Sequence, residues 1–218
     1  MESEGWAGPF ELIKTQNECD AVVKEAEKVA RVSTRKGLHI NSQLLRNLAS
    51  SPEIVKLLQP ILGDTFFLWG CHLITSKPGH KHRFHIDIEF ATIKGVTVWI
   101  GLKNLTEKTS LKVISHTNEL LQSPQELNVN DLELEKIAQE SDPRCKLHTL
   151  HAKNGEFIIW KGRTWHGTEN LSSTTRNSII LQYSCDEIPF IPESYDFPLK
   201  LSSRHFLTIP IYASSSAV

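Results

Sequence analysis

The sequence lacks a surplus of charge of either sign and a long apolar run, and each absence excludes a class of protein. Its 218 residues carry a formal net charge of −1, which gives no electrostatic reason to expect nucleic acid or membrane as a partner. No segment is long and apolar enough to span a bilayer, and Met1 to Phe10 contain no basic stretch followed by an apolar run. We therefore expect a soluble, cytoplasmic protein.

Closely spaced cysteines are also missing. The four cysteines are scattered along the chain, at Cys19, Cys71, Cys145 and Cys185. Zinc sites and disulfide frameworks both show short paired spacings, so the sequence predicts neither. We expect these thiols to be buried or idle.

The composition is that of a chain with a full hydrophobic core. Hydrophobic residues make up 39% of the sequence and charged residues 22%, which is typical of a single globular domain at this length. We expect one domain over residues 1–212, followed by a frayed tail at 213–218. Within it we expect a helical part at 1–64, a β-rich core at 65–185 and a C-terminal extension at 186–212.

Three helices are predicted near the N-terminus. The first begins after Thr15 or Asn17 as a cap and carries apolar residues at helical spacing as far as Ala30. The second covers residues 42–49. The third opens at Ser51-Pro52, a capping serine followed by proline at the first helical position, and ends near Gly63.

From residue 65 onwards the pattern changes to short extended segments rich in β-branched and aromatic residues. They cover residues 66–75, 84–90, 95–102, 110–115, 146–151, 156–160 and 175–184. One helical insertion, at about 129–140, interrupts them. A series of this length predicts a mainly β fold with flanking helices, in which the strands form a two-sheet jelly roll or cupin-like barrel.

The segment 84–90 carries the candidate chemistry. Alternation along a strand places His85, Asp87 and Glu89 on one face, with apolar residues on the other. A plausible third donor is His166. Two histidines and one carboxylate on one side of a metal are typical of non-haem Fe(II) oxygenases, so we predict an Fe(II) site. Glu89 either approaches this site or pairs with a lysine. Five other histidines are interpreted as structural: His39, His72, His148, His151 and His205.

A series of motifs carries a family resemblance. The chain shows His85-x-Asp87, then Ser110 to His116, then Gly155 to Trp160 leading into His166-Gly-Thr-Glu-Asn170, and finally Arg176. In this order they resemble the phytanoyl-CoA dioxygenase family of Fe(II)/2-oxoglutarate oxygenases, over residues 66–183.

The resemblance implies a double-stranded β-helix and specific roles for these residues. His85, Asp87 and His166 would bind Fe(II), and O2 and 2-oxoglutarate would be the cosubstrates. The far carboxylate of 2-oxoglutarate would pair with Arg176, whose planar guanidinium can bind both carboxylate oxygens. Thr168 would help to hold the same carboxylate, and Trp99 would pack beside the cosubstrate. The alternative for Arg176 is an exposed position on its strand.

The predicted reaction is hydroxylation of a C–H bond with release of succinate and CO2. Halogenating relatives have a small residue in place of the carboxylate ligand, so Asp87 argues against halogenation. The chain differs from the family pattern at Val113-Ile-Ser-His116, which lacks the usual proline and glycine. It is also short for a carrier-linked substrate, which favours a small free molecule.

A basic run, Lys77 to Arg83, directly precedes the iron motif. It is either a solvated loop or a rim that binds an anionic substrate, for which Lys81, Arg83 and Arg163 are the candidates. Two alternatives to a small-molecule hydroxylase stay open. One is an oxygenase that acts on a protein or peptide side chain, and the other is a non-catalytic, cupin-like binding protein.

Overall fold

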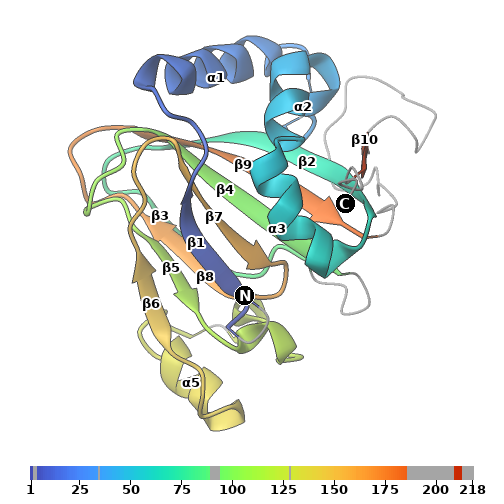
Figure 1. Cartoon of the computed structure of the whole chain (residues 1–218). Coiled ribbons are helices and arrows are strands. Elements are labelled where there is room, and N and C mark those ends of the chain that lie inside the picture. The colour runs from blue at the N-terminus through green and yellow to red at the C-terminus, as the bar shows by residue number, and fades with distance from the viewer. Residues whose placement is uncertain (2–3, 34, 89–93, 128, 186–208, 213–218) are drawn as a thin grey trace.

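Two antiparallel β-sheets face each other in the computed structural model, which describes residues 1, 4–33, 35–88, 94–127, 129–185 and 209–212 (Figure 1). The larger sheet has the order β1 (Trp6–Glu11), β7 (Glu156–Lys161), β4 (Gly95–Lys103), β9 (Arg176–Ser184), β2 (Thr65–Ser76) and β10 (Ile209–Tyr212). The smaller sheet has the order β3 (Lys81–His85), β8 (Trp165–Glu169), β5 (Leu111–Ile114) and β6 (Leu147–Leu150). The predicted jelly roll, or double-stranded β-helix, is confirmed.

The three predicted N-terminal helices are present, and they lie on the outer side of the larger sheet (Figure 1). They are α1 (Gln16–Val29), α2 (Gln43–Ala49) and α3 (Pro52–Leu62), with a short 3-10 helix, η1 (Leu38–Asn41), before α2. Thr15 and Glu18 form a capping box that satisfies the first amides of α1. Ser42 caps α2 through its side chain, and Pro52 opens α3.

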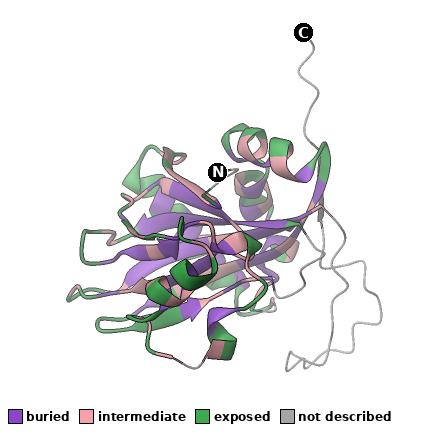
Figure 2. Ribbon diagram, turned by 90° about the horizontal axis from the view of Figure 1, so that it is seen from below, coloured by how far each residue is buried: buried purple, intermediate pink, exposed green. Residues whose placement is uncertain are grey.

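The main hydrophobic core lies between these helices and the larger sheet. Val96, Val98, Ile100 and Leu102 of β4 are fully buried in it, together with apolar side chains of all three helices. Burial is therefore concentrated along the sheet strands, while the outer surfaces of the helices are exposed (Figure 2). Because alternate residues of β4 point the other way, Thr97 and Trp99 face the smaller sheet.

Two strands were not predicted: β1, near the start of the chain, and β8, which contains His166. Strand β1 pairs with β7 at one edge of the larger sheet, and its short segment contains Gly8 and Pro9. Strand β8 lacks apolar alternation, because four of its five residues are His166 to Glu169. Its pairing with both β3 and β5 makes it a strand, so tertiary context decides its conformation.

The predicted helical insertion at 129–140 is wrong at its start. The structure has a 3-10 helix, η2 (Thr117–Glu119), then α4 (Pro124–Leu127) and α5 (Leu134–Ser141). Residues 131–133 form a turn, in which Asn130 Oδ1 accepts from the Leu132 amide. Asparagine competes with helical hydrogen bonds in this way, which delays the helix.

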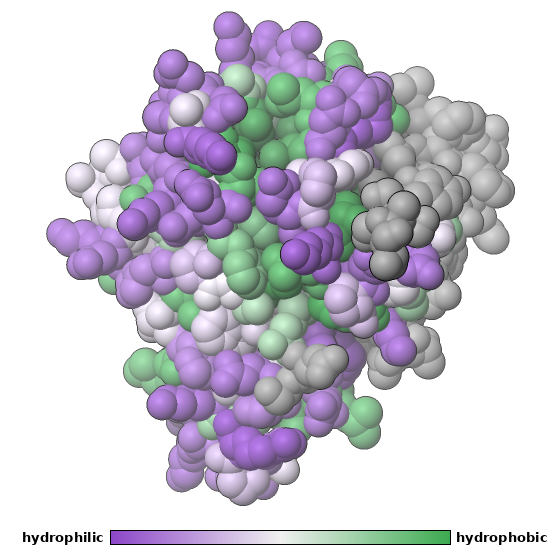
Figure 3. All heavy atoms as spheres, in the orientation of Figure 1, coloured by the Kyte–Doolittle hydropathy of each residue, from purple (hydrophilic) through white to green (hydrophobic). Residues whose placement is uncertain are grey.

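The surface is mostly hydrophilic, with an apolar band over the part of the molecule that α1, α2 and β1 occupy (Figure 3). A hollow in this region is lined by Leu12, Ile13, Glu18, Ala21, Val22, Leu44 and Leu48. Within the described ranges, no helix has both the length and the apolar character needed to cross a bilayer.

Candidate active site

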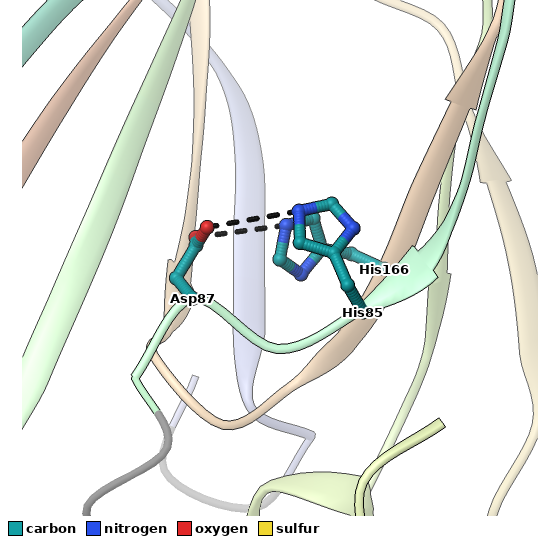
Figure 4. A group of neighbouring side chains, drawn as sticks. All are labelled: His85, Asp87 and His166. Carbon is teal, nitrogen blue, oxygen red and sulfur yellow. Dashed lines mark ion pairs between the residues drawn. The ribbon is translucent and has the colours of Figure 1, made fainter. Parts of the chain in front are cut away.

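His85, Asp87 and His166 come together between the two sheets (Figure 4). His85 is the last residue of β3, and its register partner on β8 is His166. Asp87 follows β3 in a turn, where the amides of Asp87 and Ile88 both donate to the carbonyl of Gly162. The predicted strand 84–90 therefore ends at His85, because this carbonyl takes the amides that would continue it. Glu89 and Phe90 lie outside the described residues.

The three side chains have the spacing of a metal site. His85 Nε2 lies 3.7 Å from Asp87 Oδ1, and His166 Nε2 lies 3.5 Å from Asp87 Oδ2. Ligands at right angles around one metal at about 2.1 Å lie about 3 Å apart. A small adjustment of side chains would therefore place all three donors around a single ion.

Both imidazoles are oriented by backbone carbonyls. His85 Nδ1 lies 2.9 Å from the carbonyl oxygen of Arg83, and His166 Nδ1 lies 2.8 Å from that of Thr164. A carbonyl can only accept, so each Nδ1 carries the proton and each Nε2 keeps its lone pair for a metal. Burial lowers the pKa of His85 to about 4 and also lowers the pKa of His166. Both rings are therefore neutral at pH 7, the form that ligates.

Asp87 is held by two residues that sequence reasoning missed. Thr97 Oγ1 and Trp160 Nε1 donate to its Oδ2 at 2.7 and 3.0 Å. Burial raises the pKa of Asp87, but the two histidines and these hydrogen bonds outweigh it, so the pKa is lowered overall and the carboxylate is ionised. The available signal for Thr97 was a lone polar side chain in an otherwise apolar strand.

Arg176 is completely buried on the inner face of β9, which excludes the exposed alternative. Its Nη2 donates to Thr168 Oγ1 at 3.4 Å, and its Cζ lies 5.6 Å from the centre of the Trp99 ring. Nε and Nη1 have no hydrogen-bond partner among the described residues. Burial lowers the pKa of this guanidinium to about 10, and no carboxylate of the described residues pairs with it.

The three candidates for a basic rim are engaged elsewhere. Lys81 Nζ lies 2.9 Å from Asp131, and Arg83 lies 3.7 Å from the same carboxylate and also donates to the carbonyl of Val129. Arg163 donates to the carbonyls of Leu120 and Leu121.

The comparisons with known proteins were made on both sequence and structure. Residues 6–178 match the family described as phytanoyl-CoA dioxygenase (PhyH). No curated protein sequence matches the chain.

Many solved structures share the fold. The epimerase SnoN, in complex with Fe3+, alpha ketoglutarate and nogalamycin RO, superposes with a TM-score of 0.68 at 14% identity, over 91% of this chain and 90% of SnoN. EctD from S. alaskensis, with 2-oxoglutarate and 5-hydroxyectoine, superposes with a TM-score of 0.64 at 16% identity, over 84% of this chain and 72% of EctD. CytC3 with Fe(II) and alpha-ketoglutarate superposes with a TM-score of 0.61 at 15% identity, over 84% of this chain and 73% of CytC3. At these identities the likeness shows a common fold.

Proposed function

Because this chain belongs to the phytanoyl-CoA dioxygenase family of Fe(II)/2-oxoglutarate-dependent oxygenases, we propose that it hydroxylates a C–H bond of a small molecule, releasing succinate and CO2. The observation that carries the proposal is the convergence of His85, Asp87 and His166, with both Nε2 atoms available. We propose these three residues as the Fe(II) ligands. An intact carboxylate leaves no room for a halide in its place, which supports hydroxylation over halogenation.

The residues around the triad fit 2-oxoglutarate. Thr168 lies two residues after His166 on β8, so it shares the same face at about 6.6 Å along the strand. A five-carbon dicarboxylate is long enough to join the metal to the Thr168 and Arg176 pair. We propose that Arg176 binds its far carboxylate with the two unpartnered nitrogens, and that Trp99 packs against the chain of the cosubstrate.

Each protein group has a separate task in this proposal. Bound Fe(II), with 2-oxoglutarate and O2, supplies the oxidising chemistry that inserts oxygen into the C–H bond. The Arg83 and Thr164 carbonyls hold the imidazole rings in the ligating tautomer. Thr97 and Trp160 keep the Asp87 carboxylate ionised and limit its rotation. Tryptophan rings at Trp99 and Trp160 exclude water from this side of the site.

Residues 1–212 are proposed to act as one oxygenase domain. Support comes from β1, near the start of the chain, and β10, near its end, which occupy the two edges of the same sheet. The substrate is proposed to be anionic. Lys81, Arg83 and Arg163 stay candidates for its recognition, although each already has a partner among the described residues.

The test is an anaerobic titration of the apoprotein with Fe(II) and 2-oxoglutarate, following the weak visible absorption band of the chelate. The wild type and a Glu27→Ala control, changed at an exposed position on α1, should both develop the band. Asp87→Ala should not develop the band, and its affinity for Fe(II) should fall by more than about 100-fold. Removing a metal ligand costs more affinity than removing a residue that only orients a ligand.

Absence of the band in the wild type at any concentration would contradict the oxygenase proposal. A band without succinate release in air, for every small molecule offered, would favour either of the two alternatives. Release stimulated by a peptide library rather than by small molecules would then identify an oxygenase of protein side chains.

A further inference from the structure

Buried polar atoms without partners gather on the inner face of β2 and β9. They are Trp69 Nε1, His72 Nδ1, Arg176 Nε and Nη1, Ser178 Oγ and Gln182 Oε1. A buried polar atom that nothing satisfies costs free energy, so a cluster of them is a candidate surface for a ligand to complete. His72, interpreted as structural in the sequence, belongs to this cluster.

Strand register divides the cluster into two groups. Arg176 and Ser178 lie at the start of β9, where the cosubstrate carboxylate is proposed to bind. Gln182 pairs with Thr97, the residue that holds Asp87, and therefore lies at the level of the triad. On its other side Gln182 pairs with Gly70, where a Cβ atom would come within 2.7 Å of Gln182 Oε1. Glycine thus makes the room that this amide occupies.

Trp69 lies in a bulge next to Gln182. The register of β2 with β9 shifts between Leu68 and Gly70, so Trp69 is the extra residue. Bulges turn a side chain out of the regular alternation and are frequent beside active sites. Leu68 points into the main core and Gly70 towards the smaller sheet. We place the extra residue on the inner side, because Lys36, which lies over its ring, is close enough to act on the inner-face residue His72. Its Nε1 is buried and has no hydrogen-bond partner among the described residues.

A cationic loop covers this tryptophan. The Cys71 amide donates to the Lys36 carbonyl at 2.7 Å, and Gly37 forms a parallel bridge with Cys71, which fastens the loop to β2. Lys36 Nζ lies 5.3 Å from the centre of the Trp69 ring, and it has no carboxylate partner among the described residues. Arg35 adds a second positive charge. Burial first, and then the charge of Lys36, lowers the pKa of His72 to about 4, while Asp87 opposes the shift.

We propose that Lys36, Trp69 and Gln182 form the substrate subsite, which binds a small carboxylate that also carries an N–H or O–H group. This inference rests on the proposed function and names the substrate class of the same site. Lys36 Nζ and the Trp69 indole N–H supply two donors for the two oxygens of the carboxylate, and the Gln182 amide takes the polar group. Two donors suit a carboxylate better than a phosphate, which offers three terminal oxygens.

The subsite differs from the basic run in whether its positive charge has a carboxylate partner. Asp131 neutralises Lys81 and Arg83, whereas Lys36 lies over the face of an indole ring and pairs with no carboxylate of the described residues. Lys36 is a half-buried residue. An anion gains more from a charge in such a position that lacks a carboxylate partner than from an exposed charge that already has one.

The experiment is isothermal titration of the protein loaded anaerobically with Fe(II) and 2-oxoglutarate. Three matched pairs of probes are used: benzoate and benzamide, mandelate and mandelamide, and prolinate and prolinamide, with inorganic phosphate as a fourth anion. At least one acid should bind, about tenfold tighter than its amide. Lys36→Met should weaken binding of that acid by about tenfold, and Lys36→Arg should retain most of the affinity. Trp69→Phe, which keeps an aromatic ring but removes the N–H, should weaken binding by about threefold.

The controls separate the subsite from the rest of the site. Lys24→Met, on the exposed face of α1, should bind like the wild type, and every variant should still form the absorption band of the chelate. No preference for any acid over its amide, equal binding by Lys36→Met and wild type, or tighter binding of phosphate than of every acid would overturn the subsite alone. Failure of the wild type to form the chelate would overturn the proposed function, and the subsite with it.

Discussion

The inner face of the larger sheet has two halves of opposite character. On β7 and β4, Ile158, Trp160 and Trp99 pack against Leu111, Val113 and Leu150 of the smaller sheet. On β9 and β2, the inner side chains include His72, Ser178, Gln182 and Arg176, all with unpartnered polar atoms. The first half is completed by the protein itself, and the second is the half that we propose ligands to complete.

The difference shows where folding free energy is gained and where it is given up. Burying apolar surface contributes about 25 cal/mol per Å2, so the β7 and β4 half stabilises the fold. Unpartnered buried polar atoms destabilise it, and the core between the helices and the outer face of the sheet offsets this cost. We therefore expect substitutions in the first half to change stability and substitutions in the second half to change ligand binding.

The largest contrast in stability should come from one variant in each half. Ile158→Ala removes a fully buried side chain from the packed half and should lower the free energy of unfolding of the apoprotein by about 2–5 kcal/mol. Ser178→Ala removes an unpartnered hydroxyl and should leave that free energy unchanged or slightly raised. Urea denaturation measures both. Equal losses in the two variants would show that the halves do not differ.

Arg176→Met should separate stability from binding. Loss of the guanidinium should weaken binding of 2-oxoglutarate by about 100-fold, because the buried carboxylate of the cosubstrate would lose its partner. The apoprotein should become more stable by about 1 kcal/mol, since the variant removes a buried, uncompensated charge. Chelate titration and urea denaturation give the two values. Arg176→Lys is the matched control, which keeps the charge and loses the fork; lower stability of Arg176→Met would contradict the assignment.

Thr97→Val tests the support of Asp87 at the boundary between the halves. Valine keeps the shape of threonine but removes the hydroxyl that donates to Asp87 Oδ2. We expect Fe(II) affinity to fall by about tenfold or more, as is usual for loss of a residue that orients a ligand. Competition with a coloured chelator gives the affinity. Thr149→Val, at an exposed position on β6, should have no effect; an effect of equal size there would remove the positioning role.

The smallest effect is expected for Arg83→Ala. Its side chain is 64% exposed and lies beside Asp131, so we expect KM for the substrate to rise by no more than about twofold. Steady-state succinate release, compared between Arg83→Ala and Lys36→Met, ranks the two basic regions. A tenfold rise for Arg83→Ala with none for Lys36→Met would restore the basic run as the anion-binding rim.

Much of the site could be predicted because its signals are local. His85 and Asp87 are two residues apart, and the motif containing His166 and Arg176 is a short, ordered pattern. The contacts of Thr97 and Trp160 with Asp87 could not be predicted, because they join residues 10 and 73 positions apart in the sequence. The end of β3 at His85 depends in the same way on the distant carbonyl of Gly162.

The sequence by itself determined the jelly-roll class, the three capped helices and the residues that we propose as the donors for Fe(II) and 2-oxoglutarate. These follow from periodicity, capping residues and short motifs, which act over a few residues. Only the tertiary structure decided that Arg176 is buried with no counter-ion among the described residues, that Asp131 neutralises the basic run, and that Lys36 covers Trp69. Charge compensation and burial depend on the register between strands and on contacts between residues far apart in the sequence. No pattern of neighbouring residues predicts them.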